Sequence, residues 1–475
     1  MSTSSTFHNI IEIIKSITRY KKGVLGLFLL LTFILISIFA DFIATHKPDE
    51  INLAEGYAVP FWFKAFPQYR DLPENIELKI VGSRWKVEGN CSRLTVVDDW
   101  ILCEFTPESD ERRVELSLIY SFEYPYSPPK GFYGEIAYNI TVAGGLGSTA
   151  RIRLYLDVPN GKSYQIYDSG AISYNLTRIE PSARFDARDV PLKLALGFSP
   201  YDDLGEKLFA EKGLYKLKIV IYSRIREDNY VKIAVSPLYF KIPGLAYGVL
   251  GTDNLGGDLF SNLIHGTRVS LIVGILASVV SVLLGLVVGI VAGYKGGLVD
   301  QILMFFTDTL MFLPLIPLLI AVSVFIGKIL YITIFLIALF SWMGFAMNCI
   351  AYVMSLRERL FVEAARALGA SDVYILFKHI LPQLTPIVYI TLVLNVPGAI
   401  LLESSLSFLN LGDPRVPSWG RMLYNARYSG AFSRMLWWWV VPPGVMITLL
   451  AMSFVLIGQT LDEVFNPKLR ARRLT

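Results

Sequence analysis

Six stretches of this chain are apolar over about 20 residues, the length that an α-helix needs to cross a lipid bilayer. The third and fifth stretches each contain one acidic residue, Asp308 and Glu403 respectively, together with two prolines. Both features are tolerated inside a helical bundle, where neighbouring helices satisfy polar groups. The pattern therefore predicts an all-α polytopic membrane protein with six transmembrane helices, at residues 24–44, 270–293, 302–326, 329–353, 384–409 and 436–459.

Residues 47–246, between the first and second spans, carry a different pattern. Polar and apolar residues alternate in segments such as ARIRLYLDV, where β-branched and aromatic residues are frequent. Turn sequences such as Asp98-Asp99 and Pro159-Asn160-Gly161 separate these segments. Alternation with a period of two, interrupted by turns, is typical of strands with one buried face. We expect a large β-rich domain folded as an antiparallel sandwich.

Basic residues predict the side of the membrane on which each segment lies, because cytoplasmic loops are enriched in lysine and arginine. The net charge of +4 is small, so the distribution matters more. With the N-terminus inside, the short outer loops hold Lys328, Arg415, Arg421, Arg427 and Arg434. The inner segments hold Lys15, Arg19, Lys21, Lys22, Lys295, Arg357, Arg359, Arg366, Lys378, Lys468, Arg470, Arg472 and Arg473. Both termini are therefore predicted to be cytoplasmic and residues 47–246 extracytoplasmic. The outer loop from Arg415 to Arg434 departs from the trend, so we expect packed structure there.

Two further features agree with an outer position for residues 47–246. The sequons at Asn90, Asn139 and Asn175 are candidate glycosylation sites, and all three fall in this block. Cys91 and Cys103 also fall there and form a candidate disulfide, with two buried free thiols as the alternative.

Residues 1–23 precede the first span. Their isoleucines share one helical face, which predicts a short amphipathic helix on the inner membrane surface, with a flexible tail as the alternative. These residues are Ile10, Ile13, Ile14 and Ile17. No small-residue cleavage site follows the first span, so we expect a retained anchor rather than a signal peptide.

Residues 363–382, with the sequence EAARALGASDVYILFKHILP, connect the predicted fourth and fifth spans on the cytoplasmic side. The alanines favour a helix with little side-chain bulk, and Gly369 can end it in a left-handed conformation. Ser371 is then placed to cap a second short helix, and Pro382 closes the segment before the next span. That second helix carries Val373, Ile375, Leu376 and Phe377. An amphipathic linker is the alternative explanation.

This segment resembles the EAA…G…LP loop of the permease subunits of ABC importers. The matching residues are Glu363, Ala364, Ala365, Gly369, Leu381 and Pro382. From about residue 250 onward, the chain resembles the C-type permease subunit of the dipeptide/oligopeptide/nickel family of binding-protein-dependent transport inner membrane components. GTDNLGGD at 251–258, ESSLSFLNLG at 403–412 and PSWG at 417–420 carry the resemblance, although the family's usual arginine is Gly257 here. Residues 47–246 are then an insertion before a permease core of residues 250–475.

The resemblance implies a function and a set of partners. The chain would form, with a second permease subunit, a translocation path for di- or oligopeptides, with oligosaccharides or nickel as alternative substrates. Residues 363–382 would couple the path to one of two ABC ATPase subunits, and an extracytoplasmic solute-binding protein would deliver the substrate. The rival class is a membrane-anchored surface receptor that uses the β-rich domain.

Several kinds of chemistry find no support in the sequence. The chain has no G-x-x-x-x-G-K-[ST] segment, so ATP and Mg²⁺ are expected on the partner subunits and not on this chain. The four histidines are scattered without the spacing of a zinc site. No basic stripe with interleaved aromatic residues indicates nucleic-acid binding. We therefore expect a transporter subunit in contact with lipid, with no enzyme activity, metal or cofactor of its own.

The polar and small residues inside the predicted spans suggest packing and transport roles. Asp308 and Glu403 either line the translocation path or make structural hydrogen bonds to a neighbouring helix or partner. In the second span, small residues recur at every fourth position and predict close packing of another helix. They are Ala277, Ser281, Gly285, Gly289 and Gly293.

Overall fold

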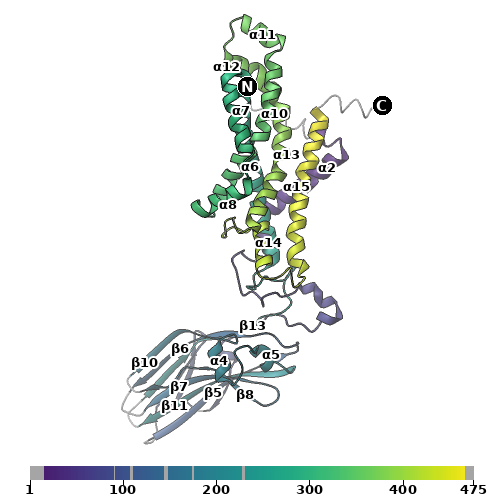
Figure 1. Cartoon of the computed structure of the whole chain (residues 1–475). Helices are drawn as coiled ribbons and strands as arrows, with labels where there is room; N and C mark the ends of the chain where they lie inside the picture. Colours follow the sequence, from purple (N-terminus) through teal and green to yellow (C-terminus); the bar gives the residue numbers. More distant parts are fainter. Residues whose placement is uncertain are drawn as a thin grey trace. The chain divides into compact units, whose positions relative to one another are not determined.

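The computed structural model describes residues 15–89, 91–106, 111–143, 148–173, 176–226 and 230–465. The chain divides into two compact units (Figure 1). The helical unit comprises residues 1–50 and 258–475, and the β unit is Ile51–Gly257. The sequons at Asn90 and Asn175 lie outside the described residues, as do Ile10, Ile13 and Ile14 of the predicted amphipathic helix.

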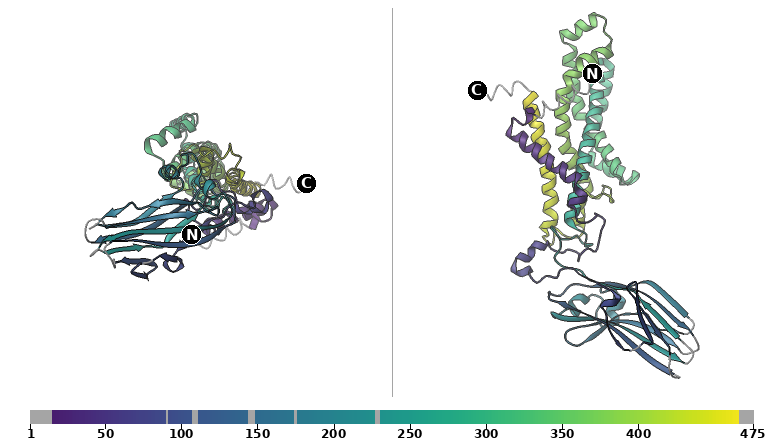
Figure 2. Two further views of the ribbon diagram at one scale, coloured as in Figure 1. Left: turned by 90° about the horizontal axis from the view of Figure 1, so that it is seen from below. Right: turned by 180° about the vertical axis from the view of Figure 1, so that it is seen from behind.

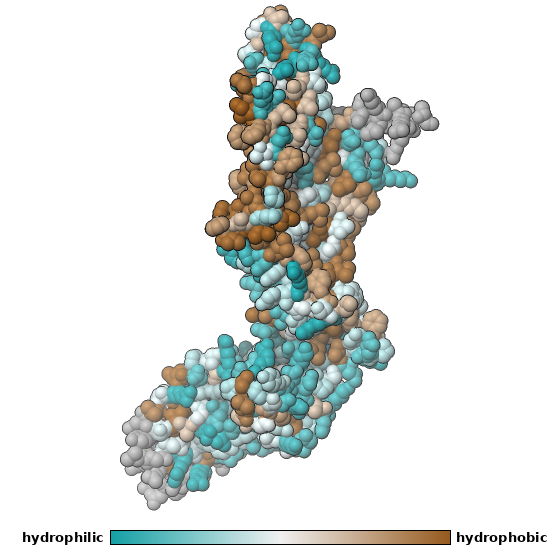
Figure 3. Space-filling view, viewed as in Figure 1, coloured by the Kyte–Doolittle hydropathy of each residue, from teal (hydrophilic) through white to brown (hydrophobic). Residues whose placement is uncertain are grey.

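The helical unit contains the segments that are suited to cross a membrane. Five are long and apolar enough: Lys21–Ile38, Leu259–Lys295, Leu330–Arg357, Asp372–Phe408 and Trp437–Phe465. Their surface is largely hydrophobic, whereas the surface of the β unit is largely hydrophilic (Figure 3). The helices are α2 (Lys21–Ile38), α3 (Ala40–Ile43), α6 (Leu259–Lys295), α7 (Gly297–Met311), α8 (Leu315–Ile326), α9 (Leu330–Ser341), α10 (Met343–Arg357), α11 (Leu360–Ala367), α12 (Asp372–Ile375), α13 (Leu381–Phe408), α14 (Trp419–Tyr428) and α15 (Trp437–Phe465).

The predicted span at residues 302–326 is wrong in its shape. The structure divides it into α7 and α8, whose axes are bent by 83° at the break (Figure 2). Pro314 lies at the break, immediately before α8. Proline has no N–H to donate and keeps the preceding residue out of helical geometry, which explains the break. Helices α7 and α8 form a sixth span only if the two are counted together as one interrupted membrane segment.

Helix α6 packs closely on its neighbours because glycines occupy the contact positions. A Cβ added to Gly289 would lie 2.5 Å from the Cβ and 2.6 Å from the Sγ of Cys349 on α10. At Gly285, the added atom would lie 2.8 Å from the carbonyl oxygen of Trp342. The predicted packing along this stripe is confirmed. Interfaces of small residues are how helices associate in lipid, where burial of apolar surface gives little drive.

Ile17 is the one residue of the predicted amphipathic face that the structure describes. Its side chain is buried in a cluster with Ile457 and Leu461 of α15. A lipid-facing role is therefore wrong for this residue, because the final helix of the same unit covers it. Lys22 at the start of α2 forms an ion pair with Glu463 of α15 and joins the same two elements.

The β unit is an antiparallel sandwich, as the alternation predicts. One sheet has the strand order β1-β13-β6-β12-β4-β3, with β10 paired to β6. The other has the order β2-β5-β11-β7-β8, with β9 paired to β7. The strands are β1 (Ile76–Ile80), β2 (Lys86–Gly89), β3 (Arg93–Val97), β4 (Trp100–Phe105), β5 (Glu111–Tyr124), β6 (Tyr133–Ala143), β7 (Thr149–Asp157), β8 (Ser163–Asp168), β9 (Ile172–Ser173), β10 (Leu176–Asp186), β11 (Gly213–Arg226), β12 (Tyr230–Val235) and β13 (Leu238–Ile242).

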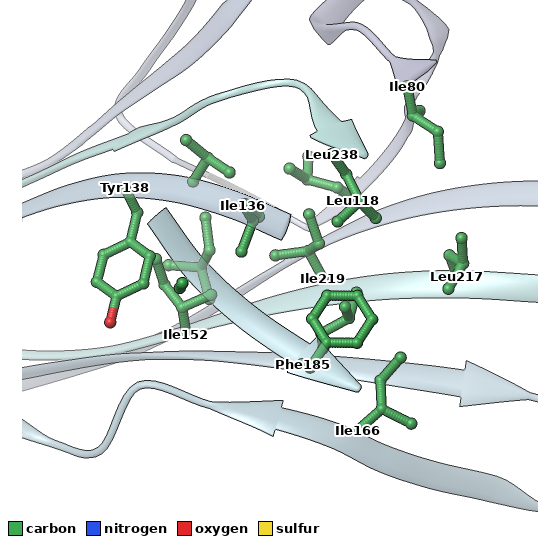
Figure 4. Close-up of a cluster of buried hydrophobic side chains, with 14 of the residues drawn as sticks. Ile80, Leu118, Ile136, Tyr138, Ile152, Ile166, Phe185, Leu217, Ile219 and Leu238 are labelled. Carbon is green, nitrogen blue, oxygen red and sulfur yellow. The ribbon is translucent and has the colours of Figure 1, made fainter. Parts of the chain in front are cut away.

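The core of the sandwich lies between the two sheets. Alternate residues of β6 and β7 are buried along the full length of each strand. Figure 4 shows Ile136 of β6, Ile152 of β7 and Ile219 of β11 within this one cluster. Because successive side chains of a strand point to opposite faces, the intervening residues of β7 lie on the outer face of the second sheet.

The β unit extends beyond the predicted end at residue 246 and reaches Gly257. The segment after β13 returns to the start of the unit, where Asn52 donates a backbone hydrogen bond of 2.9 Å to Leu255. Thr252 Oγ1 donates to the carbonyl of Glu55 at 2.6 Å and accepts from the amide of Ala58 at 2.9 Å. Part of the motif at 251–258 therefore closes the β unit.

The separate core of the β unit predicts independent folding. Residues 51–257 expressed alone should give a β-type circular dichroism spectrum and one cooperative thermal transition. Leu217→Ala, at a fully buried position of β11, should lower the free energy of unfolding by about 2–5 kcal/mol. Leu194→Ala, at an exposed position, is the control and should change it by less than about 0.5 kcal/mol. A broad, non-cooperative transition in the unaltered unit would contradict the expectation.

Candidate functional site

The loop between α10 and α13 forms two short helices that meet at Gly369. Helix α11 ends before Gly369, whose φ is +83°. The amide of Ala370 donates to the carbonyl of Ala365 at 3.1 Å, and the amide of Gly369 donates to that of Arg366 at 3.0 Å. These two bonds form a Schellman motif, which requires a left-handed residue at the glycine position. The predicted turn is confirmed.

Ser371 begins the second short helix, as predicted. Its side chain accepts a hydrogen bond of 3.3 Å from the amide of Tyr374 and caps α12. Val362 of α11 and Ile375 of α12 are fully buried in one cluster with side chains of α6 and α10. The two helices therefore form a compact knob with a fixed base. We call residues 360–377 the knob.

Large apolar side chains are exposed on the outer surface of the knob, beside charged residues such as Glu363 and Arg366. Glu363 and Ala364 are exposed, and Ala365 is half-buried. Leu360 and Leu368 are 83% and 89% exposed, and Phe377 is 68% exposed. Large apolar side chains exposed together mark a surface that a partner covers. The alanines were predicted from the sequence as part of this surface, but Leu360 and Leu368 were not. The sequence feature that could have indicated them is a leucine at each end of the helix that carries Glu363, Ala364 and Ala365.

Tyr294, at the end of α6, ties the knob to the helical bundle. Its hydroxyl donates to Asp372 Oδ1 at 2.7 Å and lies 3.4 Å from the guanidinium of Arg366. Arg357 of α10 donates to the Tyr294 carbonyl at 3.3 Å. Arg366 therefore points toward Tyr294, and Glu363 forms no ion pair with any residue that the structure describes. Nothing in the loop motif itself indicates this contact.

Pro382 does not close the segment before the next span, and that prediction is wrong. A wide turn of π-helix over Leu376–Ile380 joins α12 to α13, so that Asp372–Phe408 runs as one helical segment. Pro382 occupies the first turn of α13. The irregular turn directly before it accommodates a residue that cannot donate to the preceding turn. The knob is therefore continuous with a helix long and apolar enough to cross a membrane.

Glu403 is 2% exposed and lies on α13 near its C-terminal end. It accepts hydrogen bonds from Ser407 at 2.6 Å and Ser404 at 3.4 Å, and from the side chain of Ser418 at the start of α14. These contacts agree with the structural role that the sequence left open.

Asp308 is half-buried on α7, whereas its neighbours Phe305 and Phe306 are exposed.

The segment between α13 and α15 is packed structure, as its arginines suggested. Trp419 of α14 is fully buried, and its indole N–H donates to the carbonyl of Leu263 at 2.9 Å. Arg415 donates to Asp413 at 3.0 Å, and this hydrogen bond lowers the pKa of the Asp413 carboxyl. Arg415 therefore serves local pairing.

Cys91 and Cys103 are free thiols in the structure, so the candidate disulfide is not formed there. Cys103 is buried on β4, where burial and a hydrogen-bonding contact with Cys91 raise the pKa of its thiol. The alternative of two free thiols is the one that the structure has.

Asn139, the one sequon that the structure describes, lies half-buried on β6, and its Oδ1 atom is buried.

Comparisons with known proteins identify the helical unit. Residues 285–471 match the model of the binding-protein-dependent transport system inner membrane component family. Residues 12–60 match the N-terminal transmembrane domain of oligopeptide transport permease C. A putative peptide permease of Brucella suis is 37% identical over 220 residues, which is 46% of this chain and 72% of that protein. A glutathione transport system permease of Pectobacterium atrosepticum is 35% identical over 223 residues, 47% of this chain and 73% of that protein.

The chain therefore belongs to the family of binding-protein-dependent transport inner membrane components. Within it, the chain is a multi-pass ABC permease of the oligopeptide type. A methionine ABC transporter, solved in an inward-facing conformation, is similar at 18% identity and a TM-score of 0.34, over 44% of this chain and 95% of that one.

The contact at Tyr294 predicts a local effect of removing one hydroxyl. Tyr294→Phe should loosen the knob, because Asp372 and Arg366 lose their common partner. A lost hydrogen bond of about 0.5–1.5 kcal/mol corresponds to opening that is about 2- to 13-fold more frequent. Hydrogen exchange of the amides in residues 360–377 measures this change. Tyr352→Phe, at an exposed position of α10, is the control. Equal protection in both variants would contradict the anchoring role.

The contacts of Glu403 predict a loss of stability on truncation. Glu403→Ala leaves the buried hydroxyls of Ser407 and Ser418 without their acceptor, which costs about 1–3 kcal/mol for each unsatisfied group. Glu403→Gln keeps an acceptor oxygen and should be milder. The thermal unfolding midpoint of the purified protein in detergent distinguishes the two. Unchanged midpoints with altered transport in both variants would instead assign Glu403 to the translocation path.

Proposed function

We propose that this chain is one permease subunit of an ATP-driven importer of peptides. The observation that carries the proposal is the knob, which exposes large apolar side chains on a base fixed to the bundle, at the position of the family's coupling loop. We place both termini in the cytoplasm and the β unit outside the cell, inserted between the first span and α6. The chain itself would hold no cofactor.

The knob is suited to dock an ATPase subunit. Leu360 and Leu368 extend from its surface, and the small side chains of Ala364 and Ala365 permit close approach by a partner. Burying a leucine side chain contributes roughly 1.5–3 kcal/mol. Two ATPase subunits would bind ATP and Mg²⁺ and move the knob when they close. Because α12 continues into α13, that movement would tilt a membrane span between outward- and inward-facing positions.

A second permease subunit would cover the face of α7 and α8. Phe305, Phe306 and Phe325 are exposed on these helices, and Asp308 lies half-buried among them. Phenylalanine can face lipid, but an acidic residue at membrane depth costs at least about 2.5 kcal/mol there and faces protein or water instead. The side of α7 that bears Asp308 would therefore face the partner permease or the path between the two subunits.

The substrate proposed is a short peptide delivered by an extracytoplasmic solute-binding protein. Support comes from the names of the relatives, which are a putative peptide permease and glutathione permeases. Glutathione is itself a small peptide. Oligosaccharides and nickel remain the alternative substrates. Competition for uptake by peptides, oligosaccharides and Ni²⁺, measured with the reconstituted complex, separates the three.

Docking at the knob is tested by changing its surface and its turn separately. Leu368→Arg places a charge on the apolar surface and should abolish co-purification with the ATPase while the permease still inserts. Gly369→Val should strain the left-handed turn by roughly 1–2 kcal/mol and weaken coupling. Transport and ATP hydrolysis by the assembled complex are measured for each variant, together with Glu363→Ala.

Matched controls come from elsewhere in the chain. Gly430 also has a positive φ, +73°, and like Gly369 it has no atom within 4 Å of an added Cβ. Gly430→Val therefore imposes a similar strain away from the knob, and Tyr201→Arg places a charge on an exposed side chain of the β unit. Both controls should transport normally. Wild-type ATPase association in Leu368→Arg and Gly369→Val would overturn the docking assignment.

A further inference from the structure

The outer face of the sheet that contains β6 is hollowed into a polar cavity. Its volume is about 410 Å³, which is in the range of small-molecule sites. Four neighbouring strands line it, namely β3, β4, β12 and β6. Leu102 and Glu104 of β4, and Asn139 and Thr141 of β6, alternate with buried core residues. The cavity therefore lies on the outer face of the sandwich and not in its core.

One row of residues across the sheet has an apolar middle and polar ends. The strand register places in this row Thr95 of β3, Leu102 of β4, Ala234 of β12 and Asn139 of β6. The row is low at Ala234, because its side chain is a single methyl group. A solute in the cavity would meet apolar carbon beneath it and hydrogen-bonding groups at its edges.

Asn139 brings an unused hydrogen-bond acceptor to the cavity. Its amide oxygen is buried and has no hydrogen-bond partner among the residues that the structure describes. A buried acceptor without a donor destabilises a fold, and such groups are rare in folded proteins. An unused acceptor that lines a cavity indicates a donor supplied from outside the chain.

Thr141 supplies the complementary donor. Its hydroxyl oxygen accepts a hydrogen bond of 3.3 Å from the hydroxyl of Thr177 on β10, so its own O–H can donate elsewhere. Asn139 and Thr141 are two residues apart on β6 and lie on the same face, about 7 Å apart along the strand. An acceptor and a donor at this spacing match a solute with several hydroxyl groups, since each hydroxyl both donates and accepts.

Two charged residues of the cavity are paired with each other. Glu104 lies between Arg93 of β3 and Lys232 of β12 in the adjacent row of the sheet. The ammonium of Lys232 is 3.0 Å from Glu104 Oε1 and also lies over the ring of Tyr230, at 5.5 Å. A charged solute would have to compete with this ion pair, whereas a hydroxyl group can hydrogen-bond to it. The pairing therefore favours a neutral solute.

We propose that this cavity binds a neutral solute with several hydroxyl groups, namely a sugar. Asn139 accepts from one hydroxyl, and Thr141 donates to another. Leu102 and Ala234 contact the apolar C–H face of the sugar ring. Asn139 is then a ligand-binding residue and not a glycan attachment site. This inference concerns the β unit alone and does not depend on what the complex transports.

The test is titration calorimetry of the full-length protein in phospholipid nanodiscs, because many detergents carry sugar head groups. The probes are maltose, cellobiose and lactose, and at least one should bind at millimolar concentration. Asn139→Leu should weaken binding about 2- to 13-fold, as expected for loss of one hydrogen bond, and Ala234→Leu should abolish it by filling the cavity. Asn160→Leu makes the same change as Asn139→Leu at an exposed turn and should bind as the wild type does.

Two results would overturn the proposal at this stage. One is no binding of any of the three sugars by the wild-type protein at millimolar concentration. The other is unchanged affinity in both Asn139→Leu and Ala234→Leu.

Thermal unfolding separates a binding role of Asn139 from a structural one. Because its amide oxygen has no partner among the described residues, Asn139→Leu should leave the unfolding midpoint unchanged or raise it. A lower midpoint together with unchanged sugar affinity would assign this side chain to the fold and overturn its role in binding.

Further probes identify the class of ligand. Alanyl-alanine carries charged ends and inorganic phosphate is an anion, so both should bind more weakly than the sugar. Tighter binding of either one would overturn the sugar assignment. The intact mass of the protein should show no glycan on Asn139, and a glycan there would contradict the proposal because it would itself occupy the cavity.

Discussion

The close approach of α6 and α10 is the constraint on which the helical unit depends. In lipid, apolar burial gives helices little reason to associate, so the fit of one backbone against another must hold them. Gly285 and Gly289 permit that fit, since any side chain there would meet the backbone or side chains of α10. The same approach brings the ends of both helices together, with Arg357 bonded to the carbonyl of Tyr294. Tyr294 is thereby placed to hold Asp372, and through it the knob.

This arrangement gives the knob two mechanical connections to the membrane. One runs through Tyr294 to the end of α6, and the other through the uninterrupted helical segment from Asp372 to Phe408. The π-helical turn over Leu376–Ile380 lies on the second connection. Turns of this kind are frequent at functional positions inside helices. The knob is therefore attached to the bundle at two places and is not an isolated loop.

The parts that could be predicted from the sequence depend on local chemistry. Gly369 ends one helix and Ser371 caps the next. Both effects depend only on residues close in the sequence, and both residues have the predicted geometry. Alternation along β6 and β7 likewise indicates one buried face. The parts that could not be predicted depend on residues far apart in the chain. The contact between Tyr294 and Asp372 joins positions 78 residues apart, and the exposure of Leu368 follows from what the knob packs against. Pro314 is visible in the sequence and indicates a disturbance between α7 and α8. A proline inside a membrane span bends some helices and interrupts others, so the break itself could not be predicted.

We propose that the knob is the surface through which this permease contacts an ATPase subunit. The most direct measurement is photocrosslinking in the membrane from an ultraviolet-activated amino acid at position 368, followed by mass spectrometry of the products. Leu368 is exposed at the end of α11, so an activated side chain there samples whatever covers the knob. The account predicts a product that contains an ATPase subunit, and none when the same amino acid is at position 201 of the β unit. Products from position 368 that contain only lipid or this same chain, in cells that express the complete complex, would contradict it.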